Sequence, residues 1–597
     1  MQGKGKSCST YTPPPPRTSS PDPANRDARN SRYSVDGVID KHMLKAMGEE
    51  AMGIIDSDEL DKEDGLRRKE PLGPQMYQWE FIGLYAHYAA VGLSGGIQGL
   101  SLNFCYYYYK GANNVCANSA SMIMIPWGFK IFYAMVCDSF RPFGMRRKPY
   151  MIAGWAGVLL TTLYMAIGAS QLNAESWVAV SILTQAFLML ADVPADGYSV
   201  EMGQLEPPEE RGQILATGQR IRFIVAIFAG AIQALLVNGR STNKAPCAVS
   251  FSECWAWGFT PNGYYALIFC LTFILCIPIY YLKEPSSRNH PIHDFARHKQ
   301  DLWATLMNPT SLFLLIFVIG NGIFSAMSPI TQTYTQYNII GLTNFQSGIM
   351  TVLTNFATMG GIIVFQKYFI NWNWRYTQYL SLSTSALLGL LWLLVYYDVG
   401  GTMNPWFTIF LQLNVALSQG LAQVLYAMAV IELAKKGQES TTYELIVSCG
   451  NSASTISSII ATQLLSTVHS TTCNSPTGKC PHHEVNTLTR AFFQATNGPN
   501  KFMVYTWMIF GINMAGMYIF TRFLPIQKKQ CQEWKDAGNT FVNSANPIVA
   551  WFTPSRVGYS SAFLATITIL YQVISAGVLL NPDTACLAAF GGEGCPG

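Results

Sequence analysis

Apolar stretches long enough to cross a membrane recur along this chain, and they limit its fold more than any other feature. A helix needs about 20 mostly apolar residues to cross the hydrocarbon core, where only helices and closed barrels satisfy their backbone hydrogen bonds. Twelve stretches meet this requirement: 80–104, 116–137, 149–170, 177–200, 214–238, 264–282, 309–330, 345–369, 376–397, 405–432, 443–467 and 502–524. A thirteenth, 561–580, either spans or lies in the membrane interface. The sequence therefore predicts an all-α polytopic membrane protein.

The composition agrees with this prediction. Charged residues make up 12% of the chain, against about 25% in ordinary soluble domains, so a soluble core of this size would lack a charged surface. Residues 1–75 are polar, contain the run Pro13 to Pro16 and have no stretch like a signal peptide, which predicts a largely disordered cytoplasmic tail. A net charge of +4 is too small to indicate nucleic-acid binding.

Lysine and arginine are concentrated in alternate loops, which predicts the orientation of the chain. The basic loops lie near 141–148, 211, 283–299, 367–375, 435–436 and 528–535, and most loops between them are nearly free of these residues. Because short cytoplasmic loops keep the excess of positive charge, we expect these loops to be cytoplasmic. The sequence does not identify the membrane. We expect the plasma membrane, with an organelle membrane as the alternative.

Cysteine positions test that orientation independently. Eight of the fourteen cysteines fall in segments expected outside the cytosol, as the pairs Cys105 and Cys116, Cys247 and Cys254, Cys473 and Cys480, and Cys586 and Cys595. Disulfides persist in such compartments, so each pair is a disulfide candidate, the last only if 561–580 spans. Cys473 and Cys480 stand near His482 and His483, but in an external loop we favour a disulfide over a metal, and no metal site is predicted.

The chain also contains two related halves. Val200-Glu201, at the end of the fourth stretch, matches Ile431-Glu432, at the end of the tenth. Paired six-helix repeats are how many secondary transporters build alternating access. We expect a first half at 76–282, a cytoplasmic linker at 283–308, a second half at 309–525, and a C-terminal region at 526–597 with the extra segment 561–580.

One loop carries a specific motif. Asp138 follows the second stretch, and Gly144, Arg146 and Arg147 come before the third. This spacing resembles the cytoplasmic loop signature of the major facilitator superfamily, which implies an ion-pair latch that biases the rocking of helices. Alternatively, the arginines only anchor the loop at the inner membrane surface.

The resemblance becomes narrower when neighbouring residues are included. Three segments together resemble the folate/biopterin transporter family. The first contains Pro126-Trp127, Lys130, Asp138, Pro142, Gly144, Arg146 to Pro149 and Tyr150, and the second is the fourth-stretch sequence ADVPADGYSVE with Glu210-Arg211-Gly212. The third resembles the family more loosely, through Gly437, Glu439, Tyr443, Ser448 and Asn451. The resemblance covers about 75–525 and implies latch positions at Asp138, Arg146, Arg147, Glu201, Arg211, Glu432 and Glu439. The counterpart loop in the second half, FQKYFINWNWRY, lacks the aspartate, which makes a second latch doubtful.

Charged residues inside apolar stretches are candidates for substrate binding or ion coupling. Lys130 needs a buried partner or a watery cavity, unless it reaches back to the inner surface. Asp192 and Asp196 are four residues apart, so both face one side of the fourth helix, and one could hold a proton near neutral pH. Alternatively, Asp196 and Glu201 are solvated at the inner end of that helix.

Further polar residues follow in later stretches. Arg220 and Arg222 are natural partners for the fourth-helix acids, with Arg222 the first choice, or for an anionic solute, although a purely structural salt bridge would explain them equally well. Asn321, Asn414, Gln419 and Gln423 either bind a ligand or join helices.

These observations favour a secondary transporter of a small polar solute. The resemblance implies a folate, a pterin or a related metabolite, and the acids suggest a proton as the coupling ion. The alternatives are a facilitator for another organic anion or nutrient, and a receptor or scaffold that transports nothing. No nucleotide-binding loop and no nucleophile beside a base is present in the sequence, so we expect neither an ATP-driven pump nor an enzyme, and no cofactor.

Overall fold

The computed structural model describes residues 81–108, 122–207, 211–237, 260–284, 295–325, 332, 335–340, 342, 344–434, 437–472, 498–536 and 553–580. Within these ranges the regular structure is entirely helical. The predicted N-terminal tail at 1–75 lies outside the described residues.

Two sets of six crossings form the bundle. The first set is α4 (Ile82–Tyr108), α6 (Ile125–Gly128) with α7 (Lys130–Ser139), α8 (Lys148–Gly168), α9 (Ala174–Leu205), α10 (Gln213–Ile232) and α11 (Pro261–Cys276). The second set is α13 (Pro309–Ser325), α15 (Asn344–Val364), α16 (Trp374–Gly389) with α17 (Trp392–Tyr396), α18 (Pro405–Gln423) with α19 (Leu425–Leu433), α20 (Glu439–Thr472) and α22 (Gly498–Thr521). The predicted class, an all-α major facilitator-type fold with two six-helix halves, is confirmed.

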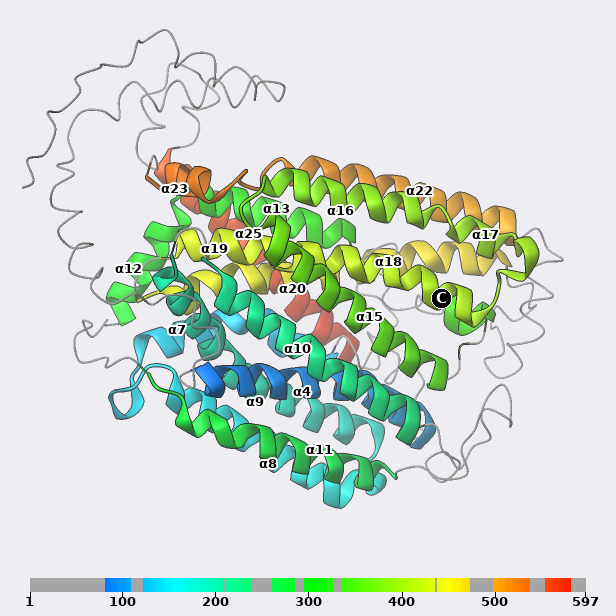
Figure 1. Cartoon of the computed structure of the whole chain (residues 1–597), viewed down its shortest axis with the longest axis horizontal. Helices are drawn as coiled ribbons and strands as arrows, with labels where there is room; N and C mark the ends of the chain where they lie inside the picture. The colour runs from blue at the N-terminus through cyan, green and yellow to red at the C-terminus, as the bar shows by residue number, and fades with distance from the viewer. Residues whose placement is uncertain are drawn as a thin grey trace, which may run out of the picture.

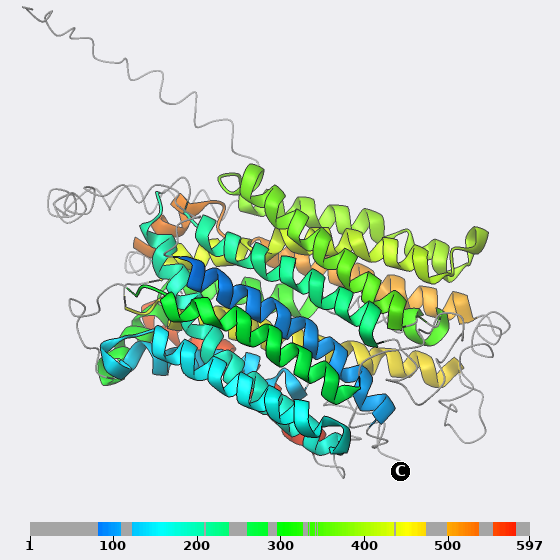
Figure 2. The same cartoon turned by 60° about the horizontal axis from the view of Figure 1, so that its bottom comes forward.

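The two halves meet along two seams. In Figure 1 the first half lies below the second, with α10 and α15 side by side between them. Along the other seam α20 packs against α7 and α9. Figure 2 shows the same helices running nearly parallel from one end of the bundle to the other. Each seam therefore brings residues that are far apart in sequence into contact.

Among the described residues, three α-helices lie outside the twelve crossings. They are α12 (Phe295–Leu306), α23 (Lys528–Asp536) and α25 (Pro554–Leu580). The sequence did not predict α12, whose residues fall in the expected linker, and α12 meets α13 at an angle of 75°. Pro309 begins α13, and a proline disfavours helical backbone in the residue before it, here Asn308, which explains the break.

Eight of the described helices, counting continuous runs, are long and apolar enough to span a membrane, or nine if α12 and α13 count as one bent span. One of the eight is Pro554–Ser575 of α25. This helix packs against α13, α20 and α6, so it contacts both halves. Gln572 of α25 accepts a hydrogen bond from Ser452 Oγ of α20 (2.5 Å) and lies where a side chain at Gly128 would project.

Local sequence fixes several helix starts. Asn173 caps α9 by accepting a hydrogen bond from Ser176 N (2.8 Å), and Thr260 caps α11 through Gly263 N (3.2 Å). Pro405 stands in the first turn of α18, where a proline costs no helical hydrogen bond. Such starts set the position of each crossing along its axis.

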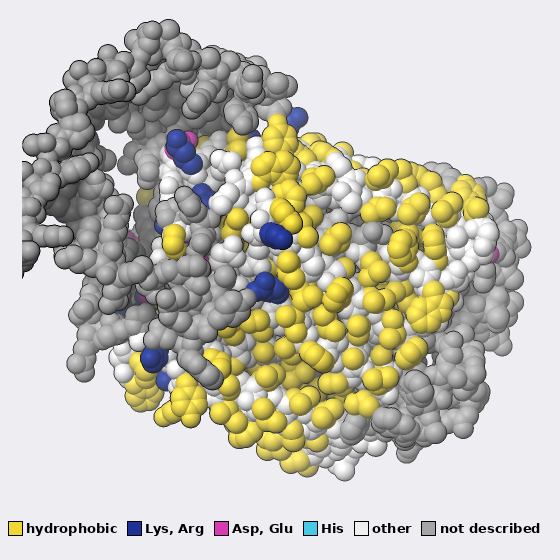
Figure 3. All heavy atoms as spheres, in the orientation of Figure 1, with side chains coloured by type: hydrophobic (Ala, Val, Ile, Leu, Met, Phe, Trp, Pro, Cys, Tyr) yellow, Lys and Arg dark blue, Asp and Glu magenta, His cyan; other side chains and the backbone are white. Residues whose placement is uncertain are grey.

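The surface divides into an apolar belt and a basic end. On the face seen in Figure 3, hydrophobic side chains are spread over the middle and the right, and the lysines and arginines lie toward the left and the centre. We call this the basic end of the bundle: the end that carries the loop 140–147 and helices α12 and α23. An apolar belt of this kind suits a lipid environment.

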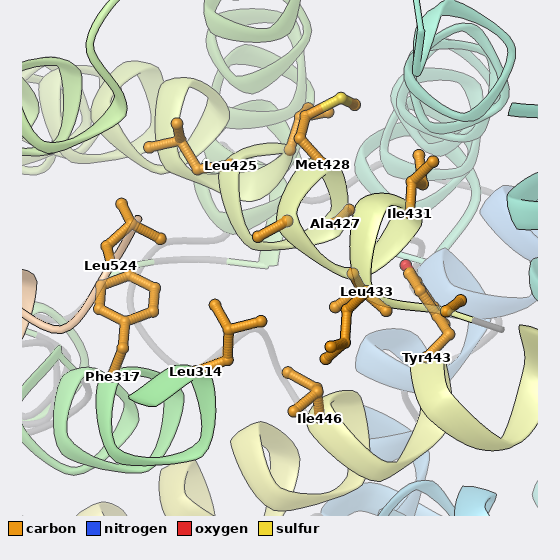
Figure 4. Packing of buried hydrophobic residues seen from close by; sticks show 14 of the residues in the cluster. Leu314, Phe317, Leu425, Ala427, Met428, Ile431, Leu433, Tyr443, Ile446 and Leu524 are labelled. Atoms are coloured by element: carbon orange, nitrogen blue, oxygen red, sulfur yellow. The ribbon is translucent and has the colours of Figure 1, made fainter. Parts of the chain in front are cut away.

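A large hydrophobic cluster fixes the second half at the basic end. Figure 4 shows Leu314 and Phe317 of α13 on one side of the cluster, with Ala427 and Leu433 of α19 and Ile446 of α20 around them. The Met428 side chain points away, toward Gly212 of the first half. Close packing of this kind leaves little room for side chains to shift. The cluster therefore holds the connection between α19 and α20, which carries two of the predicted latch acids.

The side chains of all eight cysteines in the predicted disulfides lie outside the described residues. Cys105 lies in α4, but its side chain is outside the described part, as are the other seven cysteines of the four pairs. Among the described residues, Cys137, Cys270, Cys276, Cys449 and Cys531 form no disulfide.

Candidate functional site

Lys130 lies at the centre of the bundle and is surrounded by three carboxylates. Its Nζ is 2.7 Å from Asp192 Oδ2, 3.1 Å from Asp196 Oδ2 and 3.4 Å from Glu444 Oε1. The lysine is 2% exposed, Asp192 and Glu444 are 0% exposed, and Asp196 is 4% exposed. This burial excludes the alternative that Lys130 reaches the membrane surface, and equally the alternative that Asp196 is simply solvated.

A break in the second crossing places the lysine. Helix α6 ends at Gly128 and α7 begins at Lys130, so the predicted crossing 116–137 is not one continuous helix. Polar side chains of α20 satisfy backbone groups at the break: Ser448 Oγ accepts from Ile131 N (3.0 Å), and Asn451 donates to Trp127 O (3.2 Å). The second half thus holds the segment of the first half that carries Lys130.

Helix α9 presents its two aspartates on one face, as their spacing predicts. Pro194 stands between them inside the helix, where it removes one backbone hydrogen bond. Tyr88 of α4 donates a hydrogen bond to Asp196 Oδ1 (2.9 Å), and His87 Nε2 is 3.4 Å from Asp192 Oδ1. Each aspartate therefore has a second polar contact besides Lys130.

The proton on His87 can be assigned from its neighbours. Trp155 Nε1 donates to His87 Nδ1 (3.0 Å), and an indole N–H is only a donor, so Nδ1 must be unprotonated. His87 is then neutral with its proton on Nε2, which points at Asp192. In this arrangement His87 adds no positive charge to the cluster.

The two arginines of α10 have different surroundings. Arg222 lies over the ring of Trp127, 5.4 Å from its centroid, and Lys130 lies over the same ring at 5.1 Å. Lys130 makes the direct contacts with Asp192 and Asp196, and Arg222, the charge partner expected from the sequence, adds its positive charge near Asp192. Arg220 is two residues away, and residues at that spacing point to nearly opposite sides of a helix. The two arginines therefore cannot serve one site together.

The predicted amide residues of the second half are less informative. Asn321 of α13 is half-buried, and within the described part of the chain its Oδ1 is buried without a hydrogen-bond partner. Gln419 of α18 is exposed, and the side chains of Asn414 and Gln423 lie outside the described part. Among the described side chains, neither Asn321 nor Gln419 hydrogen-bonds to Lys130 or to its three acids.

Five of the predicted latch residues meet at the basic end of the bundle. Asp138 Oδ1 is 2.8 Å from Arg147 Nη1 and 3.3 Å from Arg146 Nη2. The same guanidinium groups reach Glu439 Oε2 at the start of α20, at 3.2 and 3.0 Å. Glu201 is farther away, 3.8 Å from Arg147 and 4.0 Å from Arg146. Because Glu439 belongs to the second half and the others to the first, this cluster joins the halves.

Local structure turns the arginines inward. Gly144 has a φ of +76°, a conformation that glycine adopts without strain, and the chain turns there before Arg146. Glu284, beyond the end of α11, accepts hydrogen bonds from Arg146 N (2.6 Å) and Arg147 N (3.0 Å). Burial lowers the pKa of the Arg147 guanidinium, but the charges of Asp138, Glu201 and Glu439 raise it by more, so the net shift is upward.

The remaining two predicted latch residues form a second cluster. Arg211 Nη1 is 2.9 Å from Glu432 Oε2, which also accepts from Gln532 of α23 (2.8 Å). Nearby, Glu206 accepts from Gly212 N (2.5 Å) and Ile214 N (2.9 Å). Burial nevertheless raises the pKa of Glu206 to about 7. The loop between α9 and α10 is thus tied to α19 and α23 of the other half.

The counterpart of the aspartate latch in the second seam is uncharged. Gln366, in the π-helix Phe365–Phe369 that follows α15, donates a hydrogen bond to Gln213 Oε1 at the start of α10 (3.2 Å). This amide pair lies where the sequence of the counterpart loop lacked an aspartate. The two seams therefore close with different chemistry, one by ion pairs and one by a neutral hydrogen bond.

Sequence reasoning missed several residues of the site, above all Glu444 and His87. Helix α20 carries a polar stripe toward the first half, made of Ser440, Thr441, Glu444, Ser448 and Asn451. Its spacing of three or four residues is a helical period that the sequence already displays. Glu444 also lies inside the predicted stretch 443–467, where an acid is costly enough to indicate a role.

Comparisons with known proteins agree with this geometry. The model of the BT1 family matches residues 92–252 and 292–476, more than half of the chain. No curated protein matches the sequence. The solved structure of the proton:xylose symporter XylE bound to 6-bromo-6-deoxy-D-glucose is similar, with a TM-score of 0.51 at 10% sequence identity over 77% of this chain and 98% of the symporter. The transporter FucP in the outward conformation gives a TM-score of 0.45 at 13% identity, over 74% and 98% of the two chains.

The family match covers both halves, and the likeness to XylE gives the same fold. The protein is therefore an integral multi-pass membrane protein and a secondary transporter, not an enzyme. The chain belongs to the BT1 family, the folate/biopterin transporter family, and its fold is that of the major facilitator proton:xylose symporter.

Proposed function

We propose that this protein moves a folate, a pterin or a related small polar solute by alternating access, and that the transport is coupled to protons. One observation carries the proposal: a lysine and three carboxylates are buried together where the two halves meet. Charged groups inside a membrane are costly and mark ion and substrate pathways. In secondary transporters of this architecture such groups lie near the middle of the membrane, between the repeats.

The charge count supports a proton as the coupling ion. Lys130 offers one positive charge to three acids, and like charges that share a buried site cannot all remain ionised. One acid therefore holds a proton when the halves are closed. Release of that proton on one side of the membrane and uptake on the other would couple its gradient to the movement of the halves.

The surroundings of Arg222 support an anionic or heteroaromatic solute. Lys130 is enclosed by acids, so it is not free to bind a carboxylate of the solute in this arrangement. Arg222 is half-buried and lies beside the ring of Trp127. A guanidinium grips a carboxylate with two hydrogen bonds, and an aromatic ring offers a surface for stacking a flat ring. The same chemistry would serve another organic anion, which remains the second candidate.

The clusters at the basic end support the alternating movement. We infer that this end faces the cytoplasm, because positive loops stay on that side, and we place the protein in the plasma membrane as a working assignment. In the structure, the ion pairs of Arg146 and Arg147 with Glu439 hold the halves together there. Opening toward the cytoplasm then requires these pairs to break.

The test is transport into proteoliposomes that contain the purified full-length protein. Labelled folate, labelled biopterin and a panel of other organic anions are offered with and without a pH gradient. Asp192→Asn and Asp196→Asn should each abolish uphill accumulation while leaving some downhill exchange. Glu533→Gln, which changes an acid with a 40% exposed side chain at the basic end, is the matched control.

Two outcomes would contradict the proposal. If the parent protein accumulates folate or biopterin equally well without a pH gradient, the proton is not the coupling ion. If neither compound enters but another organic anion does, the substrate class is wrong and the second candidate takes its place.

A further inference from the structure

Glu444 differs from the two aspartates around Lys130 in how its oxygens are bound. Asp192 has the shortest contact with the lysine and faces the Nε2–H of His87, and Asp196 has the lysine and the Tyr88 hydroxyl. Glu444 has only the longest lysine contact, 3.4 Å. Its Oε2 is buried and accepts no hydrogen bond within the described part of the chain.

A buried oxygen without a donor is costly for a carboxylate and much less so for a carboxylic acid. An ionised carboxylate has acceptor sites on both oxygens, whereas the protonated group carries its own O–H and can donate. The carboxyl groups of Glu444 and Asp196 also contact the same ammonium group of Lys130, so two ionised acids would compete for one cation there. The geometry thus fits a neutral Glu444 beside an ionised Asp196.

The groups that face Glu444 come from several helices. They are Lys130 and Cys137 of α7, Asp192 and Asp196 of α9, Tyr426 of α19, and Tyr443 on its own helix. Lys130 is the cation that contacts Glu444 directly, and both aspartates contact it more closely than Glu444 does. The other cation beside the cluster, Arg222 of α10, adds its positive charge near Asp192. The surplus negative charge therefore falls on Glu444.

Glu444 also belongs to the other half of the molecule. Lys130, Asp192 and Asp196 lie on α7 and α9 of the first half, and Glu444 lies on α20 of the second. If Glu444 loses its proton, a buried charge without a full partner appears at the contact between the halves. Water would stabilise that charge, and water reaches it only if the halves separate at this point.

We propose that Glu444 is the acid that carries the exchangeable proton, and that its protonation lets the two halves close around Lys130. The proton comes from water on the side to which the site is open, and the carboxylate becomes a carboxylic acid. After the halves have reversed, the proton returns to water on the other side. Asp192 and Asp196 remain ionised as permanent partners of Lys130. This inference rests on the proposed proton coupling and names the group responsible for it.

The first experiment needs no substrate. A protonated carboxyl group has its own carbonyl band in the infrared spectrum, and a pH titration of the purified full-length protein follows that band. Glu444→Gln should remove the titrating band, and Glu444→Asp should keep it at a shifted position. Glu533→Gln, outside the cluster, should leave it in place. A band that survives Glu444→Gln and disappears in Asp196→Asn would overturn the assignment.

The second experiment measures coupling in proteoliposomes with labelled biopterin and labelled folate. Glu444→Gln resembles the protonated acid, so it should exchange label at a rate within a few-fold of the parent but lose accumulation driven by a pH gradient. Glu444→Asp should recover part of the accumulation. Undiminished gradient-driven accumulation by Glu444→Gln would overturn the inference while the proposed function stands. Absence of gradient-driven uptake in the parent itself would instead contradict the proposed function, and the infrared result would still decide where the proton resides.

Discussion

Thr441 donates two hydrogen bonds to one oxygen of Asp138, one from its backbone N (2.9 Å) and one from its hydroxyl (2.8 Å). The two residues belong to different halves, and Asp138 is completely buried. The other carboxylate oxygen of Asp138 faces Arg147 and Arg146. The Asp138 carboxylate thus accepts hydrogen bonds from both halves of the molecule, and its negative charge stabilises each of these contacts.

Neutralising Asp138 should shift the conformational balance more than it changes substrate affinity. Asp138→Asn leaves two buried arginines short of a partner, and breaking a buried ion pair costs about 3–5 kcal/mol. Because the contact touches no solute, turnover should fall by a factor of ten or more while equilibrium binding changes little. Arg147→Gln should behave in the same way. Comparison of exchange rates with binding constants for the same ligand checks this.

Thr441→Val offers a milder version of that experiment. It removes the hydroxyl bond and keeps the backbone bond, so turnover should fall less than in Asp138→Asn. Lys529→Gln serves as the control, since that side chain is 86% exposed at the basic end. A large loss of substrate affinity at an unchanged exchange rate in either variant would show that Asp138 and Thr441 do not act as a latch.

Glu206 should make thermal stability depend on pH. Burial raises its pKa to about 7 in the folded protein, above the ordinary value of 4.5. A raised carboxyl pKa means that the folded state binds the proton more tightly than the unfolded state, so this stability is fully present below pH 4.5 and is lost as the pH rises from 4.5 to about 7. Between pH 4.5 and 7, Glu206→Gln should therefore gain stability relative to the parent. Melting curves in detergent measure this difference, and an unchanged difference across that range would contradict it.

Two glycines should tolerate no side chain where α15 crosses α18. A Cβ at Gly361 would collide with Leu417 O, and one at Gly420 would collide with Thr358 O. Both obstacles are backbone atoms, which cannot move aside as a flexible side chain can. Gly361→Ala and Gly420→Ala should each destabilise the protein by about 1–3 kcal/mol, as overpacked cores do. Gly511→Ala has open space around it and is the matched control. Equal melting temperatures for all three would disprove the close contact.

The orientation can be tested with thiol reagents. Cys247 and Cys254 lie outside the described residues, and the sequence places them on the side opposite to Cys8. In intact cells, after reduction, an impermeant reagent should label the pair and spare Cys8. A tag at the C-terminus should be accessible from the same side as Cys247 if α25 spans. The opposite labelling pattern would reverse the assignment of the basic end to the cytoplasm.

Much of the architecture could be predicted because membrane helices leave a strong mark in the sequence. The length of each apolar stretch follows from the thickness of the membrane, so the twelve stretches correspond to the twelve crossings. The breaks were less predictable. The interruption at Phe129 depends on Ser448 and Asn451 of a helix more than three hundred residues later, and α12 is too polar to resemble a membrane segment.

The candidate site also has features that the sequence predicts and features that it does not. The positions of Asp192 and Asp196 on one face follow from helical geometry alone, which the sequence contains. The choice of Lys130 over Arg222 as their partner does not, because both cations are available on neighbouring crossings and only the packing of α7 against α9 decides. The contact of His87 and Tyr88 with the aspartates depends on the rotation of α4, which the sequence does not specify.

Helix α25 has a consequence for the mechanics of the transporter. It contacts the second half along α13 and α20, and it contacts the first half where Gln572 lies over the bare backbone of Gly128. When the halves rock, α25 cannot stay fixed to both. Because α25 contacts α13 and α20 more extensively than α6, it would move with the second half. It would then slide past Gly128, which has no side chain to obstruct it. The absence of a side chain at Gly128 then lets the amide of Gln572 move past this position without a steric clash.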